Sequence, residues 1–179
     1  FKLGDLDLAT HIRRTQLLRD GHTLSVVTGV MCKALGIETL IAPMTDGKVR
    51  TVIHTIEGSL AFQEYFVKCK CDPVVTDITY CGSGTYGASD TFMEALTTSD
   101  IMIFCPSNPF LSIAPMLALK DVRKKVENFK GKRIVVSPIV ASQAIKGPAA
   151  KILKELGHEI SALGIARLYQ GICDTFVLD

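Results

Sequence analysis

The sequence predicts a single α/β domain with a mainly parallel sheet, and two apolar runs carry this prediction. Residues 101–105 and 134–136 are short, unbroken apolar segments, which is typical of strands buried on both faces. Each run ends in a loop that contains proline and leads to a helical pattern, so strands alternate with helices. Such alternation implies right-handed crossovers between parallel strands of one sheet.

Helical and strand patterns continue along the rest of the chain. Helices are expected over residues 8–19, 22–35, 90–96, 113–119, 121–128, 148–156 and 161–169. Further strands are expected over residues 38–43, 49–55, 74–81 and 175–179. The segment 62–70 fits both periods: alternation permits a strand, while Phe62, Tyr65 and Phe66 also share a helix face. We favour the helix.

The composition argues against several classes of protein. Twenty basic and 18 acidic residues give a net charge of +2 without a basic block, so no nucleic acid is expected as a partner. No apolar run reaches the roughly 18 residues of a membrane span, and no signal peptide opens the sequence. The six cysteines lack the paired spacing of a zinc site, so we expect reduced thiols and a cytoplasmic protein.

Both ends of the sequence look cut. A helical pattern begins within a few residues of Phe1, and residues 175–179 resemble a strand that reaches the functional edge of its sheet. The length is sufficient for one substantial core. We therefore expect residues 1–179 to be a single α/β domain from a longer chain, with a sheet that is incomplete at both ends.

The loop after the strand at 101–105 is the first candidate site. Pro106 and Pro109 fix the backbone on either side of Ser107 and Asn108. Open α/β sheets bind ligands at the carboxyl ends of their strands, which is where this loop is expected. The alternative is a structural turn in which the Asn108 side chain bonds to its own backbone. We favour a role for Ser107 and Asn108 in ligand binding.

A second candidate site follows the next strand of the parallel sheet. Ser137 ends that strand, and Lys146, Gly147 and Pro148 lead into the next helix. The free amides and the dipole at a helix N-terminus attract anions, and a lysine adds a point charge for phosphate. An exposed lysine before an ordinary helix is the alternative, but we favour phosphate binding.

Residues 82–87 read Gly-Ser-Gly-Thr-Tyr-Gly, which matches the dinucleotide-binding fingerprint between a strand and a helix. That fingerprint also expects an acidic residue about 20 positions further on, where this chain has Cys105 to Asn108. The following helix begins late, after Ala88 and Ser89. We therefore favour a loop without a ligand, and keep a nicotinamide-dependent oxidoreductase as the alternative.

Asp5 and Asp7 lie close to His11 where the first helix begins. Two carboxylates and water can hold Mg²⁺, but helix capping accounts for one of them without any function. The other three histidines show no metal-ligand spacing, and no Ser-His-Asp or Cys-His set can be assembled. The residues alone assign no metal ligands.

Six segments together resemble the 2-phospho-L-lactate transferase family, nearly from end to end. They are LGDLDLATHIRRT, APMTDGKVRT, FQEYFVK, CPSNPFLSIAP, VSPIVASQAIKGPAAKI and ALGIARLYQGICDTFVLD. The resemblance implies a Rossmann-like α/β fold, a three-layer sandwich. It also implies a transferase that moves a 2-phospho-L-lactyl (or phosphoenolpyruvyl) group from a guanosine diphosphate adduct to 7,8-didemethyl-8-hydroxy-5-deazariboflavin, in deazaflavin coenzyme biosynthesis. GMP is released, and Mg²⁺ is the implied cofactor.

The resemblance assigns roles residue by residue. It implies substrate binding by Gly4, Ser107, Asn108, Ser137, Lys146 and Gly147. Asp5 and Asp7 match the part of the family that lies at the deazaflavin site, so with Asn108 they are the candidate catalytic residues. The general base is expected to be Asp5, Asp7 or a residue outside the given sequence, and a homodimer is possible.

The sequence also departs from the family pattern. Leu6 stands where an arginine is expected, and Ala141-Ser142 stands where Gly-Gly is usual. The first strand of the family, its glycine-rich phosphate loop and its metal ligands are expected ahead of Phe1. A non-catalytic nucleotide-binding module is therefore the alternative from another functional class.

Overall fold

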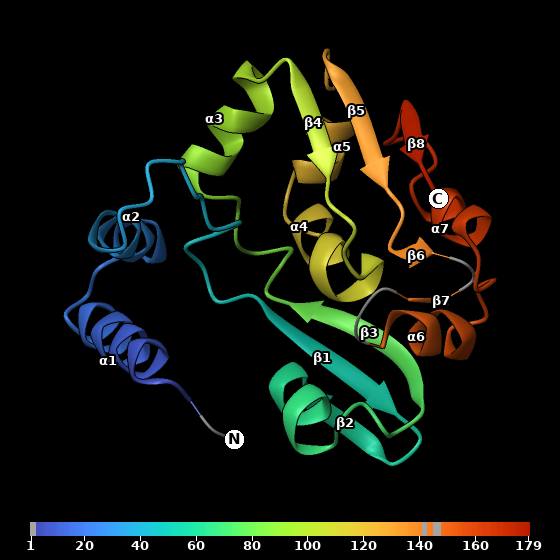
Figure 1. The fold of residues 1–179 in the computed structure, drawn as a ribbon, viewed down its shortest axis with the longest axis horizontal. Helices are drawn as coiled ribbons and strands as arrows, with labels where there is room; N and C mark the ends of the chain where they lie inside the picture. Colours follow the sequence, from blue (N-terminus) through green and yellow to red (C-terminus); the bar gives the residue numbers. More distant parts are fainter. Residues whose placement is uncertain (1–2, 141–142, 145–147) are drawn as a thin grey trace.

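The computed structural model describes residues 3–140, 143–144 and 148–179 (Figure 1). Within these ranges the strands form an antiparallel sheet, a parallel sheet and a two-stranded ladder. The antiparallel sheet, in spatial order, contains β2 (Gly58–Ala61), β1 (Arg50–Thr55) and β3 (Val75–Cys81). The parallel sheet contains β4 (Ile101–Phe104), β5 (Lys132–Val136) and β8 (Thr175–Val177). The ladder pairs β6 (Ile139–Val140) with β7 (Gln143–Ala144).

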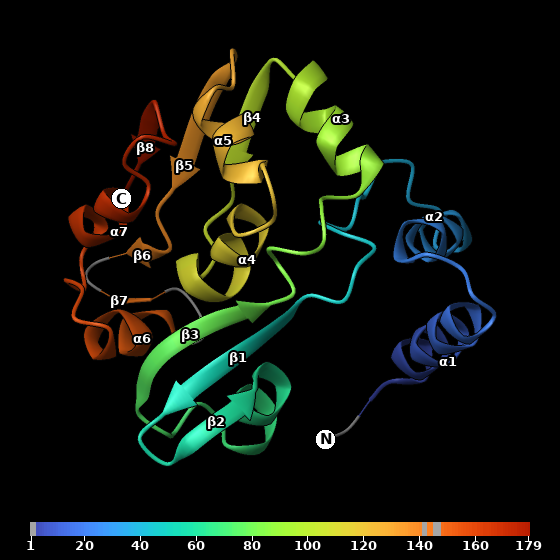
Figure 2. The same ribbon diagram turned by 180° about the vertical axis from the view of Figure 1, so that it is seen from behind.

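The parallel sheet confirms the predicted α/β class. Phe104 of β4 lies beside Val135 of β5, which lies beside Phe176 of β8. On this face the sheet shares a core with α5 (Val122–Glu127) and α7 (Ala162–Leu168), and Figure 2 shows α5 lying across β4 and β5. The expected burial of β4 on both faces is wrong among the described residues, because the opposite face is apolar but open, with Ile101 and Ile103 56% and 59% exposed.

The antiparallel sheet is a second organising element, which the sequence did not predict as a sheet. Strands were expected over residues 49–55 and 74–81 but not at β2, and β1 lies between β2 and β3 and pairs antiparallel with both. Ile53 of β1 is fully buried in a core with Tyr65, Val75 and Ile152. This small core joins the sheet to α6 (Ala149–Glu155), which carries Ile152.

The strand predicted over residues 38–43 is wrong, because this segment is irregular. Leu40 is 76% exposed, and Ile41 is also exposed. A strand needs a neighbour for its backbone hydrogen bonds, and no strand in the described ranges pairs with this segment. The apolar run therefore connects α2 to β1 without joining a sheet.

The predicted helices are confirmed, with shifted ends. They are α1 (Asp5–Arg19), α2 (Leu24–Ala34), α3 (Asp90–Thr98), α5, α6 and α7. The ambiguous segment 62–70 is helical and contains a π-helix, η1 (Glu64–Lys68). A second π-helix, η2 (Pro109–Ile113), precedes α4 (Ala114–Leu117), so helical structure begins earlier than residue 113. In the described ranges, no helix combines the length and apolarity needed to cross a membrane.

Helices α1 and α2 form a pair that lies to one side of the sheets (Figure 1). The hydroxyl of Thr23 caps α2 by accepting from Val26 N. The Asp46 carboxylate accepts from both the amide and the hydroxyl of Ser25, at 2.7 and 2.9 Å. The start of α2 is therefore tied to the loop that precedes β1.

Candidate active site

The parallel pairing of β4 with β5 brings two predicted loops to one edge of the sheet. Phe104 and Val135 are register partners, and Ser107 and Ser137 follow them within three residues. Carboxyl ends of parallel strands meet at the same edge, where open α/β sheets bind ligands. The structure therefore places Ser107, Asn108 and Ser137 in adjoining loops.

The side chain of Asn108 serves as the N-cap of η2. Its Oδ1 accepts from Phe110 N and Leu111 N, both at 3.0 Å, and Pro109 occupies the first helical position. The Nδ2 atom is buried and finds no hydrogen-bond partner among the described residues. Because an unpaired buried donor costs free energy, capping explains only the acceptor half of this amide.

The Ser137 side chain makes both of its hydrogen bonds within its own turn. It is 4% exposed, and its hydroxyl donates to Ile139 O at 3.0 Å and accepts from Ile139 N at 3.1 Å. Its amide donates to Val177 O. The side chain thus shapes its own turn and is not free to meet a ligand in this conformation, so its predicted role in substrate binding stays a prediction.

Ser107 borders an apolar cavity of about 300 Å³ beneath the loop. Side chains of α3, β4, η2, α4 and α5 line this cavity, and Cys105 and Ser112 are among its few polar members. The serine therefore lies where the loop meets the core, next to the Asn108 cap.

Gly4, Asp5 and Asp7 lie at the start of α1. Gly4 is the N-cap by backbone geometry alone, so the expectation that Asp5 or Asp7 caps this helix is wrong; Asp5 Oδ1 accepts only from the adjacent Leu6 N, at 2.9 Å. All three residues are exposed, and α1 packs mainly against α2. No hydrogen bond in the described part of the chain joins them to the Asn108 loop, so the structure does not bring the two halves of the predicted site together.

Lys146 and Gly147 lie outside the described residues, and their predicted phosphate contact stays a prediction. The structure describes Pro148, which directly precedes α6, and α6 begins at Ala149. The helix predicted from residue 148 is therefore present and begins one residue later, at Ala149.

The Gly82–Gly87 loop packs onto the segment before β1. Tyr86 lies so close over Gly47 that a Cβ on Gly47 would overlap its ring. Thr45 Oγ1 donates to Gly87 O at 2.6 Å, and the helix begins only at Asp90. Because the loop is filled by its own tyrosine and lacks a helix N-terminus, the structure favours the interpretation as a loop without a ligand.

Tyr80 was missed by sequence reasoning, although it holds η2 in place. Its hydroxyl donates to Phe110 O at 2.6 Å and so joins β3 to the helix that Asn108 caps. Burial, with a smaller contribution from Asp77, raises the pKa of Tyr80 to about 12, so the phenol keeps its proton and donates. A tyrosine in a strand gives no signal of this contact.

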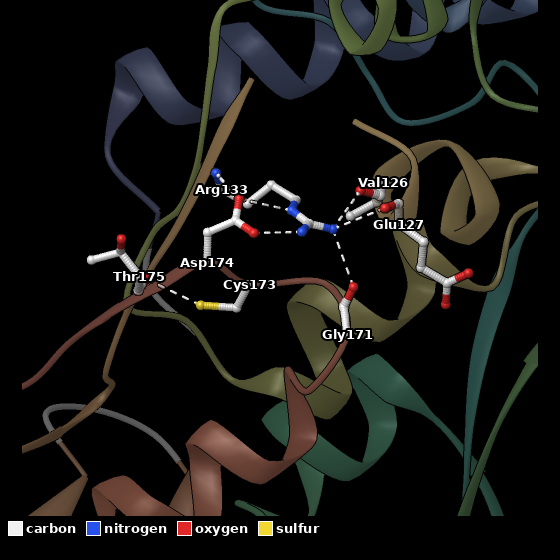
Figure 3. A network of polar contacts seen from close by, with 7 residues as sticks. All are labelled: Val126, Glu127, Arg133, Gly171, Cys173, Asp174 and Thr175. Atoms are coloured by element: carbon white, nitrogen blue, oxygen red, sulfur yellow. Dashed lines mark hydrogen bonds and ion pairs between the residues drawn. The ribbon is translucent and has the colours of Figure 1, made fainter. Parts of the chain in front are cut away.

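Arg133 was also missed. Its guanidinium donates to the carbonyl oxygens of Val126, Glu127 and Gly171, at 3.0 to 3.2 Å, and pairs with Asp174 (Figure 3). This network ties the end of α5 and the segment before β8 to the first residues of β5. In the sequence, the only indication of a role for Arg133 was its position directly before the apolar run at residues 134–136.

These features define a Rossmann-like α/β protein whose ligand site is expected at the carboxyl edge of a parallel sheet. Two crystal structures of a Bacillus halodurans protein, one described as a UPF0052 family member, have a similar fold, with TM-scores of 0.65 and 0.63. Their identity to this chain is 10% and 11%, and the similarity covers 93% of this chain and 51% of theirs. This likeness concerns the fold alone.

Sequence comparison goes further. A family model described as 2-phospho-L-lactate transferase CofD matches residues 1–179. The 2-phospho-L-lactate transferases of Methanosarcina acetivorans and Methanocaldococcus jannaschii are 36% and 37% identical to 99% of this chain. The chain belongs to the 2-phospho-L-lactate transferase family. It spans 57% and 58% of the length of those two relatives.

Proposed function

We propose that the protein is a transferase that moves a 2-phospho-L-lactyl or phosphoenolpyruvyl group from a guanosine diphosphate adduct to 7,8-didemethyl-8-hydroxy-5-deazariboflavin. The family match over residues 1–179 supports this proposal. The observation that carries it is the Asn108 loop, which leaves a buried amide donor without a described partner at the carboxyl edge of the sheet. A bound substrate oxygen is a suitable acceptor for that donor.

The reaction joins the acceptor hydroxyl to the phosphorus that carries the lactyl group. The hydroxyl oxygen forms the new P–O bond, its proton passes to a base, and the P–O bond to GMP breaks with its electrons on GMP. Such transfers depend on alignment and charge stabilisation more than on covalent help from the protein. In this proposal Asn108 orients one substrate, Lys146 and Gly147 hold the diphosphate, and Asp5 or Asp7 takes the proton.

Mg²⁺ is part of the proposal, but the described residues do not supply a complete site for it. No group of three or more His, Cys, Asp or Glu side chains is placed to hold a metal in the part of the chain that the structure describes. Mg²⁺ is usually held by one or two carboxylates together with water and substrate phosphate, but Asp5 and Asp7 are exposed at the start of α1, and no hydrogen bond among the described residues joins them to the Asn108 loop. We therefore assign no step of the reaction to the metal.

Calorimetric titration of the natural full-length protein tests the proposal. We expect GDP and then the deazariboflavin to bind, and GMP to be released from the guanosine diphosphate adduct when Mg²⁺ is present. Phospholactyl and phosphoenolpyruvyl donors are compared in the same assay. Binding of neither ligand would contradict the proposal, and binding of both without turnover would identify a nucleotide-binding module.

A further inference from the structure

A hollow of about 560 Å³ lies at the amino edge of the parallel sheet, between the end of α3 and the helix α5 that packs against it. Small-molecule sites in proteins have volumes of about 300–1,000 Å³. Figure 1 shows α3 reaching the edge at which β4 and β5 begin, whereas the Asn108 loop and Ser137 follow the other ends of these strands. The hollow therefore lies at the opposite edge of the sheet from the candidate active site. Its charged lining residues are Asp121, Lys124, Lys125 and Lys130.

The stretch from Lys120 to Arg133 is strongly basic for a nearly neutral chain. It contains seven basic and two acidic residues, whereas the whole chain has a net charge of +2. Apolar and acidic residues interrupt the basic ones in the sequence, and the structure brings Lys124, Lys125 and Lys130 together at the hollow. All three are exposed, and none of them forms an ion pair among the described residues. Their charges are therefore available to a ligand.

Helix α5 turns a polar stripe toward the hollow. The stripe has the i, i+3, i+4, i+7 spacing of one helix face and consists of Asp121, Lys124, Lys125 and Asn128. Arg123 and Glu127 lie off this stripe and pair with each other at 3.5 Å. Pairing along the helix therefore accounts for Arg123 but not for the two lysines of the stripe.

The walls of the hollow are held in place without a ligand. Asn128 Nδ2 donates to Lys124 O at 2.7 Å and so closes the last turn of α5. Lys132 N donates to Asp100 O at 3.1 Å, and a Cβ on Gly131 would overlap that same oxygen. This close approach fixes the loop after α5 against the turn between α3 and β4.

The lining suits a ligand that carries phosphate. The three lysines and Asp121 sum to a charge of +2, which matches the roughly two negative charges of a phosphate monoester, and the lysine ammonium is a compact point charge suited to phosphate. Ser99 donates its amide to Ala95 O at the end of α3, and its exposed hydroxyl has no hydrogen-bond partner among the described residues. Leu96 and Phe129 add a small apolar floor for the rest of the ligand.

We propose that this hollow is a binding site for a small phosphorylated ligand. Lys124, Lys125 and Lys130 hold the phosphate oxygens, and the Ser99 hydroxyl donates to one of them. The inference does not rest on the proposed transfer reaction, whose candidate residues lie at the start of α1 and at the carboxyl edge of the sheet. Leu96 lines both this hollow and the apolar cavity that Ser107 borders, so the ligand contacts a side chain that also walls that cavity.

Calorimetry with inorganic pyrophosphate on the natural full-length protein tests the site. The titration is done at saturating GDP and without Mg²⁺, so that pyrophosphate is kept out of the proposed donor site. We expect pyrophosphate to bind, and the double variant Lys124→Gln with Lys125→Gln to weaken it on the order of tenfold. Absence of binding to the wild type would overturn the inference. If GDP does not bind, the proposed function fails, whereas the lysine variants still decide whether this site exists.

The matched control is the double variant Lys120→Gln with Lys132→Gln. Both lysines belong to the same basic stretch, but neither lines the hollow. The control removes the same charge and should change pyrophosphate affinity by less than about twofold. Equal losses in the two double variants would show that the general field of the stretch attracts the anion, and would overturn the inference. Melting temperatures should stay unchanged, because all four side chains are exposed.

Lysine acetylation read by mass spectrometry locates the ligand without any substitution. At a pyrophosphate concentration about ten times its Kd, acetylation of Lys124, Lys125 and Lys130 should slow on the order of tenfold, because the free site is depleted by that factor. Lys120 and Lys132 should react at their original rates. Uniform protection of all five lysines, or protection of none, would contradict a site in the hollow.

Discussion

Arg133 at the start of β5 and Asp174 just before β8 hold each other through backbone and side chain alike. Arg133 N and Nε both donate to Asp174 Oδ2, at 2.9 and 3.0 Å, and Asp174 N donates to Arg133 O at 2.9 Å. The pair therefore fixes the register of β5 with β8. The pairing of the two strands continues to Ser137, whose amide donates to Val177 O at 2.9 Å.

Replacing Arg133 by methionine should destabilise the fold. The change removes the guanidinium from the carbonyl oxygens of Glu127 and Gly171 and from Asp174, and we expect a loss of about 2 kcal/mol in the free energy of unfolding. Arg123→Met is the control, because Arg123 makes only an exposed pair with Glu127 at 3.5 Å and should cost less than about 1 kcal/mol. Urea denaturation measures both. Equal losses in the two variants would contradict the structural role of Arg133.

The same pair predicts a pH dependence of stability. The hydrogen bonds from Arg133, first from its side chain and then from its backbone amide, lower the pKa of Asp174 from 3.8 to about 2. Because the folded pKa is depressed, the stabilisation is present above the unfolded pKa and is lost as the pH falls from about 4 to about 2. The difference in urea midpoint between wild type and Asp174→Asn should therefore shrink over this range. A constant difference would show that the carboxylate is not held in this way.

Asn108 variants separate capping from ligand binding. Asn108→Ala removes both functions and should cost about 1 kcal/mol of stability through the lost cap. Asn108→Ser restores a capping oxygen but not the amide donor. Both variants should lose turnover more than GDP affinity, while only the alanine variant loses stability. Wild-type turnover in the serine variant would remove the amide donor from the reaction.

Lys146→Ala should weaken GDP binding by on the order of tenfold, since a charge-assisted hydrogen bond to phosphate contributes about 1.5–3 kcal/mol. Lys154→Ala, at an exposed position in the last turn of α6, is the matched control. Isothermal calorimetry at low and moderate salt measures both affinities. Unchanged affinity in Lys146→Ala would exclude the lysine from the phosphate site.

Gly84→Val tests the remaining oxidoreductase alternative. A Cβ at Gly84 meets nothing within 4 Å, so the variant should fold normally and keep GDP binding and turnover. A dinucleotide fingerprint needs its second glycine for close approach to the pyrophosphate. If the wild type binds NAD or NADP and Gly84→Val abolishes that binding, the dinucleotide interpretation is correct.

Local patterns in the sequence were sufficient for the parallel sheet and most helices. The apolar run at Ile101 to Cys105 has the length and composition of a buried strand. Helices α2, α3 and α7 begin at the side-chain caps Thr23, Ser89 and Ser161. The placement of Ser107 and Asn108 at a carboxyl edge followed from the same reasoning. The segment at 38–43 failed because an apolar run predicts a strand only if a neighbouring strand is available.

By itself the sequence determined the α/β class, the family resemblance and the two candidate loops, because each depends on short-range periodicity or on residue types at fixed spacing. Tertiary structure decided the antiparallel sheet, the ion pair of Arg133 with Asp174 and the hollow that joins the end of α3 to the lysines of α5. It also decided that the Asn108 side-chain oxygen accepts hydrogen bonds while its nitrogen has no partner among the described residues. These contacts join residues by backbone conformation and by packing between distant segments, and no local pattern encodes either.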